Sequence, residues 1–213
     1  MTTSEDRAPE ERLPRRRGPR GPYAKSEKTR EAILDAALAV FAEGGFRGGS
    51  LREIASRVGV TDPALLHHFG TKSGLLEAVL RRRDELARAQ VPLETGDPMQ
   101  VVTGLIELVR FNASTPGVVD LYSTLAAEAT TPSHPVHEYF AERYRTVRGG
   151  LRGAFRELDG EGMLRDGVDP EWAADATVAL MDGLQVQWLH DPTSVDMAGS
   201  LARFIELVVR SPD

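Results

Sequence analysis

The side chains with the clearest chemical potential lie between residues 50 and 72, in the segment SLREIASRVGVTDPALLHHFGTK. Lys72 follows Thr71, a suitable N-cap, so it would stand at the start of a helix, where unpaired backbone N–H groups and the helix dipole favour a phosphate. Arg52 falls on the polar side of the preceding apolar repeat, where it can face water or a partner. For Lys72, a solvated lysine without a ligand is the simpler alternative.

Two short helices are predicted to position these side chains. In the first, apolar residues recur at the spacing of one helical face: Leu51, Ile54, Ala55 and Val58. Ser50 and Glu53 have the spacing of a capping box, in which each side chain accepts the other residue's backbone N–H at the start of the helix. Gly59 is predicted to end this helix, because glycine enters the left-handed cap without a steric penalty.

The second helix is predicted to begin at Thr61 or Asp62, with Pro63 in its first turn and Gly70 at its end. Two short helices joined by a turn of about three residues form a helix-turn-helix, whose second helix fits the major groove of DNA. A structural helical hairpin with solvated polar residues has the same spacing. The pattern of these helices alone leaves both interpretations open.

The distribution of charge favours the DNA-binding interpretation. Residues 1–90 carry a net charge of +4, and residues 91–213 carry one of −10. Between residues 12 and 30, eight Lys and Arg residues stand against one acidic residue, Glu27. We therefore expect only the N-terminal part of the chain to approach a polyanion.

The stretch from Thr29 to Leu76 closely resembles the N-terminal domain of the TetR family of transcriptional repressors. The resemblance covers an opening helix (TREAILDAALAVFAEGGF), the two short helices (SLREIASRVGV and DPALLHHFG) and the start of a long fourth helix (TKSGLL). It implies an N-terminal three-helix helix-turn-helix DNA-binding domain, followed by a helical C-terminal ligand-binding and dimerisation domain.

The resemblance also implies roles for single residues. Arg52 would reach a base edge or a nearby phosphate, and Lys72 would contact a phosphate. Asp62, Pro63 and Ala64 would stand at the groove-facing start of the recognition helix, and His67 and His68 at its backbone-facing end. Thr61 and Leu66 complete the predicted set of DNA-binding residues.

Two of these residues depart from the pattern of the family. Leu66 stands where the family usually carries a tyrosine that touches DNA, and Asp62 stands where a neutral or basic residue is commoner. Leu66 can only pack against a sugar or a thymine methyl group, whereas Asp62 could accept from a cytosine amino group. Either change would alter the preferred DNA sequence and leave the fold intact.

The first residues differ in composition from the rest of the chain. Residues 1–23 contain one leucine and no Ile, Val, Phe or Trp, so they bury too little surface to offset the entropy of ordering. We expect a disordered basic arm over residues 1–24, a helix-turn-helix DNA-binding domain over 25–72, and a helical regulatory and dimerisation domain over 73–213. The run PRRRGPRGP is either an arm for DNA or a solubilising tail.

Helical spacing recurs along most of the chain and strand patterns are weak, so the fold class is predicted to be all-α. The expected helices cover residues 29–46, 72–90, 99–112, 118–129, 137–158, 171–189 and 195–210. In the helix over 72–90, the side chains expected to point inward are Leu75, Leu76, Val79, Leu80 and Leu86. The last two helices are apolar on more than one face, which favours a homodimer, and TetR-like repressors pair through these helices.

In the family that the chain resembles, the C-terminal half binds a small molecule in an apolar cavity among the central helices. The candidate effector-binding residues here are Phe111, Tyr122, Leu125, Met181, Gln185 and Trp188. Such residues at helical spacing more often form an ordinary core, and this alternative stays open. A cavity lined by them would favour a mostly apolar or aromatic effector held by a few polar groups.

Several other classes of protein are disfavoured by the sequence. It has no cysteine, which removes disulfides and thiolate metal sites, and it lacks the His-Glu-x-x-His, Glu-x-x-His and Gly-x-Ser-x-Gly patterns. His134 and His137 flank Pro135 in an evident loop and are better explained as surface histidines than as metal ligands. We therefore expect no enzyme, no metal and no cofactor. Without an apolar stretch of 18 residues, a cytoplasmic protein without membrane contact is expected.

Together these features predict a ligand-responsive, DNA-binding transcriptional repressor. It would bind a palindromic operator as a homodimer and be released by a small, mostly apolar effector. Its partners would be double-stranded DNA, the effector and a second copy of the chain. The alternative is a helical protein–protein adaptor that keeps the hairpin without binding DNA, and Asp62 and Leu66 are the features that favour it.

Overall fold

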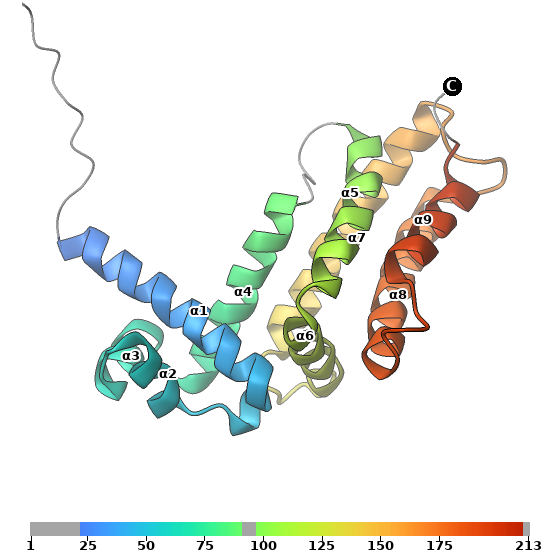
Figure 1. The fold of residues 1–213 in the computed structure, drawn as a ribbon. Coiled ribbons are helices and arrows are strands. Elements are labelled where there is room, and N and C mark those ends of the chain that lie inside the picture. Colours follow the sequence, from blue (N-terminus) through green and yellow to red (C-terminus); the bar gives the residue numbers. More distant parts are fainter. Residues whose placement is uncertain (1–21, 91–96, 211–213) are drawn as a thin grey trace, which may run out of the picture.

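The computed structural model describes residues 22–90 and 97–210 and is built from α-helices (Figure 1). The helices are α1 (Pro22–Gly48), α2 (Leu51–Val58), α3 (Asp62–Phe69), α4 (Lys72–Gln90), α5 (Pro98–Ala113), α6 (Pro116–Glu128), α7 (His137–Gly160), α8 (Pro170–His190) and α9 (Met197–Val208). The prediction of an all-α fold is confirmed. A search of the described helices finds none with the length and apolar character needed to span a membrane.

The predicted arm over residues 1–24 lies mostly outside the described residues. Helix α1 begins at Pro22, within the segment assigned to the arm, and continues to Gly48 with a kink at Gly45. Residues 1–21, which include the run PRRRGPRGP, are not among the described residues.

Aspartate N-caps set the start of three helices in the C-terminal half. Asp97 accepts a hydrogen bond from the backbone N–H of Met99 at 2.9 Å, and Asp169 accepts one from that of Trp172 at 2.9 Å. Asp196 does the same for α9, with the N–H of Gly199 at 2.8 Å. Because these caps are local in sequence, the predicted starts of α5, α8 and α9 lie within two residues of the observed ones.

The end of α2 and the start of α3 lie where the sequence predicts them, but the predicted cap at the start of α2 is absent. Gly59 adopts the left-handed conformation with φ of 76°, and the Thr61 hydroxyl accepts from the N–H of Ala64 at 3.3 Å. The predicted capping box is wrong, because the Ser50 side chain makes no cap hydrogen bond. The Glu53 carboxylate accepts from Arg57 at 2.7 Å and is directed away from the start of the helix.

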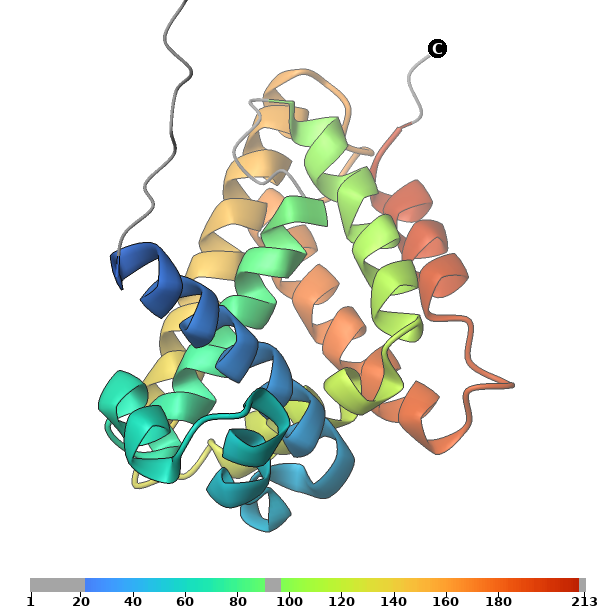
Figure 2. The ribbon, with the colours of Figure 1, turned by 60° about the vertical axis from the view of Figure 1, so that its left-hand side comes forward.

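Two hydrophobic cores stabilise the fold. The N-terminal core joins α1, α2, α3 and the first half of α4 to α6 and the start of α7, and includes Ile33, Phe41, Ile54, Leu65, Leu76, Leu125 and Phe140. The C-terminal core joins α5, α7, α8 and α9, and includes Val102, Leu105, Leu151, Phe155, Leu184 and Leu201. Helices α4 and α7 contribute residues to both cores, since each runs from one core toward the other (Figure 2).

One predicted core residue of α4 is exposed. Leu75, Leu76, Val79 and Leu80 are buried as predicted, but the exposed fraction of Leu86 is 40%. Leu86 lies seven residues after Val79 and therefore on the same side of the helix. This end of α4 extends past the crossing with α1, so nothing from α1 covers it (Figure 1).

We predict that Leu65→Ala destabilises the protein through its N-terminal core. Leu65 is completely buried on α3, so its truncation should lower the free energy of unfolding by about 2–5 kcal/mol. Urea unfolding at fixed protein concentration measures the change. The exposed Leu86→Ala is the matched control, with an expected loss of about 0.5 kcal/mol or less. Equal unfolding midpoints for the two variants would contradict this description of the core.

Candidate DNA interface and effector cavity

The recognition helix α3 is anchored by one side and presents the other to solvent. Leu65 is buried against α2, whereas Thr61, Pro63, Ala64 and His67 are exposed. Asp62, Leu66 and His68 are half-buried, and Leu66 packs against the N-terminal core. The exposed residues lie on the groove-facing start of α3 and on its outer side, as a helix that inserts into a groove requires.

The two cations predicted for DNA contact differ in their surroundings. Arg52 on α2 is exposed and makes no polar contact with a described residue, so its guanidinium is available to a ligand. The Lys72 ammonium donates to the Arg47 carbonyl at 3.3 Å and lies 4.8 Å from the centre of the Phe46 ring. Lys72 therefore ties the start of α4 to the end of α1, and its remaining N–H donors can still reach a phosphate.

An ion-pair cluster fixes the helix-turn-helix on α1. Arg57 of α2 forms two parallel hydrogen bonds to Glu43 of α1, at 3.0 and 2.6 Å, and a third to Glu53 at 2.7 Å. The hydrogen bonds from Arg57 hold the pKa of the Glu43 carboxyl below its usual value. Two parallel bonds restrict orientation as well as distance, so this exposed contact supports the packing of α2 against α1.

The junction between α3 and α4 is equally tight. Thr71 caps α4 by accepting from the N–H of Gly74 at 3.0 Å. A Cβ atom on Gly74 would clash with the Phe69 carbonyl, so only glycine lets the two helices approach this closely. The first turn of α4 therefore lies close against the end of α3.

A cavity of about 150 Å³, which we call the outer chamber, lies between α4, α5, α7 and α8. Its apolar lining consists of Ala87, Leu105, Leu108, Val147, Leu151 and Met181, and its polar lining includes Arg81, Asp84, Arg88, Tyr139, Glu142, Arg143 and Thr146. A cavity of similar size in a model protein holds a benzene molecule. The outer chamber is thus large enough for one ring-sized group.

A smaller cavity of about 40 Å³, the inner chamber, adjoins the outer one. The two share Leu108, Arg143, Val147 and Met181 in their walls. The rest of the inner chamber is more polar and is lined by Arg83, Asn112, Tyr122, Tyr144, Val178, Asp182 and Gln185. The two chambers therefore lie side by side.

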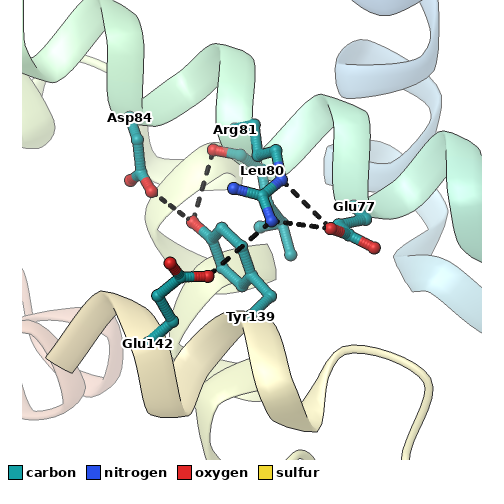
Figure 3. Close-up of polar contacts among 6 residues, drawn as sticks. All are labelled: Glu77, Leu80, Arg81, Asp84, Tyr139 and Glu142. Carbon is teal, nitrogen blue, oxygen red and sulfur yellow. Dashed lines mark hydrogen bonds and ion pairs between the residues drawn. The ribbon is translucent and has the colours of Figure 1, made fainter. Parts of the chain in front are cut away.

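Hydrogen bonds join α4 to α7 in the wall of the outer chamber (Figure 3). The Tyr139 hydroxyl donates to the Asp84 carboxylate at 2.6 Å and lies 3.3 Å from the Leu80 carbonyl. Nearby, Arg81 donates to Glu77 at 2.9 Å and lies 3.9 Å from Glu142. Asp84 is only 6% exposed and Tyr139 is also 6% exposed, so this contact is shielded from water.

Arg143 completes this network from the side of the inner chamber. Its guanidinium lies 2.9 Å from Asp84 and donates to the Tyr122 hydroxyl at 2.5 Å. Burial raises the pKa of Tyr139, and the neighbouring charge of Asp84 raises it further, so the phenol keeps its proton and acts as a donor. Burial also raises the pKa of Asp182, which accepts from the Tyr144 hydroxyl at 2.8 Å.

The structure distributes the six predicted effector-binding residues among different places. Tyr122, Met181 and Gln185 line the chambers. Leu125 lies in the N-terminal core, Trp188 lines a separate groove near the end of α8, and Phe111 is 41% exposed outside both chambers. Phe111 is next to Asn112 in sequence, but at this point of α5 Asn112 is buried and Phe111 is exposed.

Sequence reasoning missed the charged residues of the cavity. Arg83, Asp84 and Arg143 line its walls, but none of them is among the six residues that the sequence suggests. A signal for two of them was present, since Arg83 and Asp84 continue the stripe of Leu76 and Leu80 at helical spacing. Charged residues at core-facing positions mark a buried polar site.

Comparisons with known proteins agree with this arrangement. Residues 33–79 match the bacterial regulatory proteins of the tetR family, and residues 100–209, more than half of the chain, match the C-terminal domain of BetI-type transcriptional repressors. The transcriptional regulator TtgR of Pseudomonas putida is 29% identical over 191 residues, which cover 85% of this chain and 90% of that protein.

Two further matches differ in extent. The repressor AcnR of Corynebacterium glutamicum is 36% identical over 83 residues, which span 39% of this chain and 43% of that protein. A solved transcriptional regulator from Saccharomonospora viridis, in complex with choline, has 27% identity and a TM-score of 0.69, covering 87% of this chain and all of that one.

These matches decide between the two classes that the sequence left open, a DNA-binding regulator and a protein–protein adaptor. Both segments, 33–79 and 100–209, match transcriptional regulators, and together they take in the helix-turn-helix and the parts of α5, α7 and α8 that line the chambers. The chain therefore belongs to the TetR family of bacterial transcriptional regulators, and it is a DNA-binding, ligand-responsive regulator of transcription with a BetI-type C-terminal domain, not an enzyme.

Proposed function

We propose that the protein represses transcription as a homodimer on a palindromic operator, and that a small effector bound in the two chambers releases it. The course of α4 is the observation that carries this proposal. Its first residue, Lys72, lies beside the helix-turn-helix, and Arg81, Asp84, Ala87 and Arg88 near its other end line the outer chamber. A ligand that displaces the second half of α4 would therefore move the recognition helix.

The DNA contacts that we propose fall into two groups. Arg52, with Thr61, Asp62, Pro63 and Ala64 at the start of α3, would contact base edges, and Lys72, with His67 and His68, would contact the backbone. Half-buried Leu66 has little surface left for a thymine methyl group. Residues 1–24 would add phosphate contacts as an arm. Because DNA is the partner, we place the protein in the cytoplasm.

The proposed effector has a ring-sized apolar body and a polar group. The apolar walls of the outer chamber, with Met181, suit the body, while Tyr122 and Gln185 contribute to the polar inner chamber. The Saccharomonospora viridis relative was solved in complex with choline. In this chain the guanidiniums of Arg83 and Arg143 lie 4.4 and 5.0 Å from the centre of the Tyr122 ring, so this aromatic face is already occupied by cations and is a poor site for a quaternary ammonium.

The proposed dimer interface is the exposed side of α8 and α9, at the far end of the molecule from α2 and α3 (Figure 1). Along α8, apolar and small residues alternate at spacings of four and three: Trp172, Ala176, Ala179, Gly183 and Val186. This repeat suits close packing against a second helix. The exposed fractions of Trp172, Val186 and Leu207 are 55, 48 and 58%, which is high for large apolar side chains.

Release of the operator follows from a difference in affinity. The effector must bind more tightly to the conformation that cannot hold DNA, since equal affinity for both conformations would shift nothing. Operator DNA must then weaken effector binding by the same factor. In the DNA-bound dimer, the two recognition helices would lie about 34–36 Å apart, in successive major grooves.

Selection of bound sites from random double-stranded DNA tests the proposal directly. A palindromic consensus is expected for the wild-type protein. Arg52→Ala should lose discrimination at particular base positions by about 1–3 kcal/mol, because an unpaired exposed arginine on α2 is available to read a base. The absence of any enriched sequence would refute operator binding, and an unchanged consensus with Arg52→Ala would refute the role of this residue.

Lys72→Met should weaken binding to all DNA sequences alike. Loss of one phosphate contact should reduce the slope of log affinity against log salt by about one unit. Methionine keeps much of the apolar stem that packs near Phe46, which limits damage to the junction of α1 and α4. Arg110→Met, which removes an exposed charge from α5, is the matched control and should leave the slope unchanged. Identical slopes for both variants would show that Lys72 contacts no phosphate.

Val186→Glu should convert the dimer to monomers, because it places a charge within the proposed interface. Sedimentation equilibrium measures the change, and affinity for the palindromic site should fall with it. Phe111→Glu is the control, since Phe111 is similarly exposed but lies on α5. If Val186→Glu remains dimeric, or if Phe111→Glu dissociates equally, the interface lies elsewhere.

A further inference from the structure

The inner chamber contains more hydrogen-bond donors than its own residues satisfy. Arg83 on α4 is only 7% exposed, yet its single hydrogen bond to a described residue is a long one, 3.5 Å to Asp84. A guanidinium has five N–H donors. The guanidinium lies 4.4 Å from the centre of the Tyr122 ring, and Arg83 belongs to the lining of the inner chamber.

Asn112 on α5 adds a second donor to the same chamber. It is 5% exposed, and its side-chain nitrogen is buried without any hydrogen-bond partner. A buried donor without an acceptor is unfavourable, because it has lost its hydrogen bond to water and gained none in return. Two helices thus each contribute an underused donor to one small space.

The carboxylates close to these arginines, Asp84 in the wall of the outer chamber and Asp182 in the wall of the inner one, are already engaged. Asp84 accepts from Tyr139 and pairs with Arg143, at 2.6 and 2.9 Å. Asp182 accepts from Tyr144 at 2.8 Å. Arg83 and Arg143 balance these two acids in formal charge, and the buried donor of Asn112 still has no acceptor.

We propose that the inner chamber binds the acceptor oxygens of the effector, a carboxylate or a carbonyl group, through Arg83 and Asn112. The proposal rests on the proposed function, in which the effector occupies these two chambers. The ring-sized body of the effector would fill the outer chamber, and its oxygens would reach the inner one past Leu108 and Met181, which line both. Arg83 can hold two oxygens side by side, and Asn112 can donate to one of them.

Calorimetric titration of the full-length protein without DNA tests this class of effector. The probes are benzoate, acetophenone and benzyltrimethylammonium, which share a ring and differ in the polar group. Benzoate or acetophenone should bind at least about tenfold more tightly than the ammonium, and the tighter of the two distinguishes a carboxylate from a carbonyl group. The proposal is overturned if the ammonium binds as tightly, or if no probe binds up to its solubility.

Asn112→Asp locates the binding site. It keeps the shape of the side chain but replaces the donor with an acceptor, so the dissociation constant of the tighter oxygen probe should rise at least about tenfold. Gln100→Glu makes the same chemical change at an exposed position of α5 and should alter it less than about twofold. Equal affinities for the two variants would overturn the proposal.

Arg83→Lys provides a second test that does not depend on the folding of Asn112→Asp. Lysine retains the charge but loses the planar fork, so the affinity for the oxygen probes should again fall about tenfold, with thermal unfolding as the check on folding. Unchanged affinity in a folded Arg83→Lys protein would overturn the proposal.

The proposed function and this inference can fail separately. If no probe binds while the wild-type protein still selects a palindromic site, the oxygen-binding role is wrong and operator binding stands. If the probes bind and depend on Asn112 but no DNA sequence is enriched, the chamber binds oxygens and the proposed operator is wrong.

Discussion

Asp84 of α4 is buried, and both of its carboxylate oxygens are held by side chains of α7. Tyr139 donates to one oxygen at 2.6 Å, and Arg143 lies 2.9 Å from the other. A buried charge that loses its partner costs about 3–5 kcal/mol, so α4 cannot leave α7 unless a new group replaces these contacts. The position of α4, and of everything attached to its first turn, depends on this shielded ion pair.

At its other end, the first turn of α4 contacts α1 and the helix-turn-helix. Arg57 fixes α2 on α1 through Glu43, and the close approach at Gly74 fixes α4 on α3. Lys72 adds a contact from α4 back to the end of α1. In the proposed release mechanism, these contacts are the ones through which a small rotation of α4 would turn the recognition helix.

The helices could be predicted from the sequence because their determinants are local. Apolar spacing, aspartate caps and glycine ends act within a few residues, and the observed bounds of α4 are those predicted. The Ser50 capping box failed because Glu53 has a stronger partner in Arg57, four residues away and also bound to α1. A side chain with two possible partners cannot be assigned from spacing alone.

The cavity could be predicted only in part, because it is assembled from distant parts of the chain. Tyr139 and Asp84 are 55 residues apart, and nothing in their local sequence pairs them. Tyr122, Met181 and Gln185 were found because buried residues of helices α6 and α8 are natural candidates. Phe111 is apolar but exposed, whereas its polar neighbour Asn112 is buried and lines the chamber. Hydrophobicity alone predicts the opposite burial for these two residues.

The N-terminal core has a consequence for how this protein could be divided or recombined. It contains Leu121, Tyr122 and Leu125 of α6 and Tyr139 and Phe140 of α7, packed together with residues of α1 to α4. A fragment that ends after the helix-turn-helix would lack Leu75 and Leu76. Ile33 and Phe41, which belong to the same core, would then be partly uncovered. A chimaera that exchanges the DNA-binding domain between relatives must therefore also include the residues of α6 and α7 that pack in this core, or keep the same side chains at those positions.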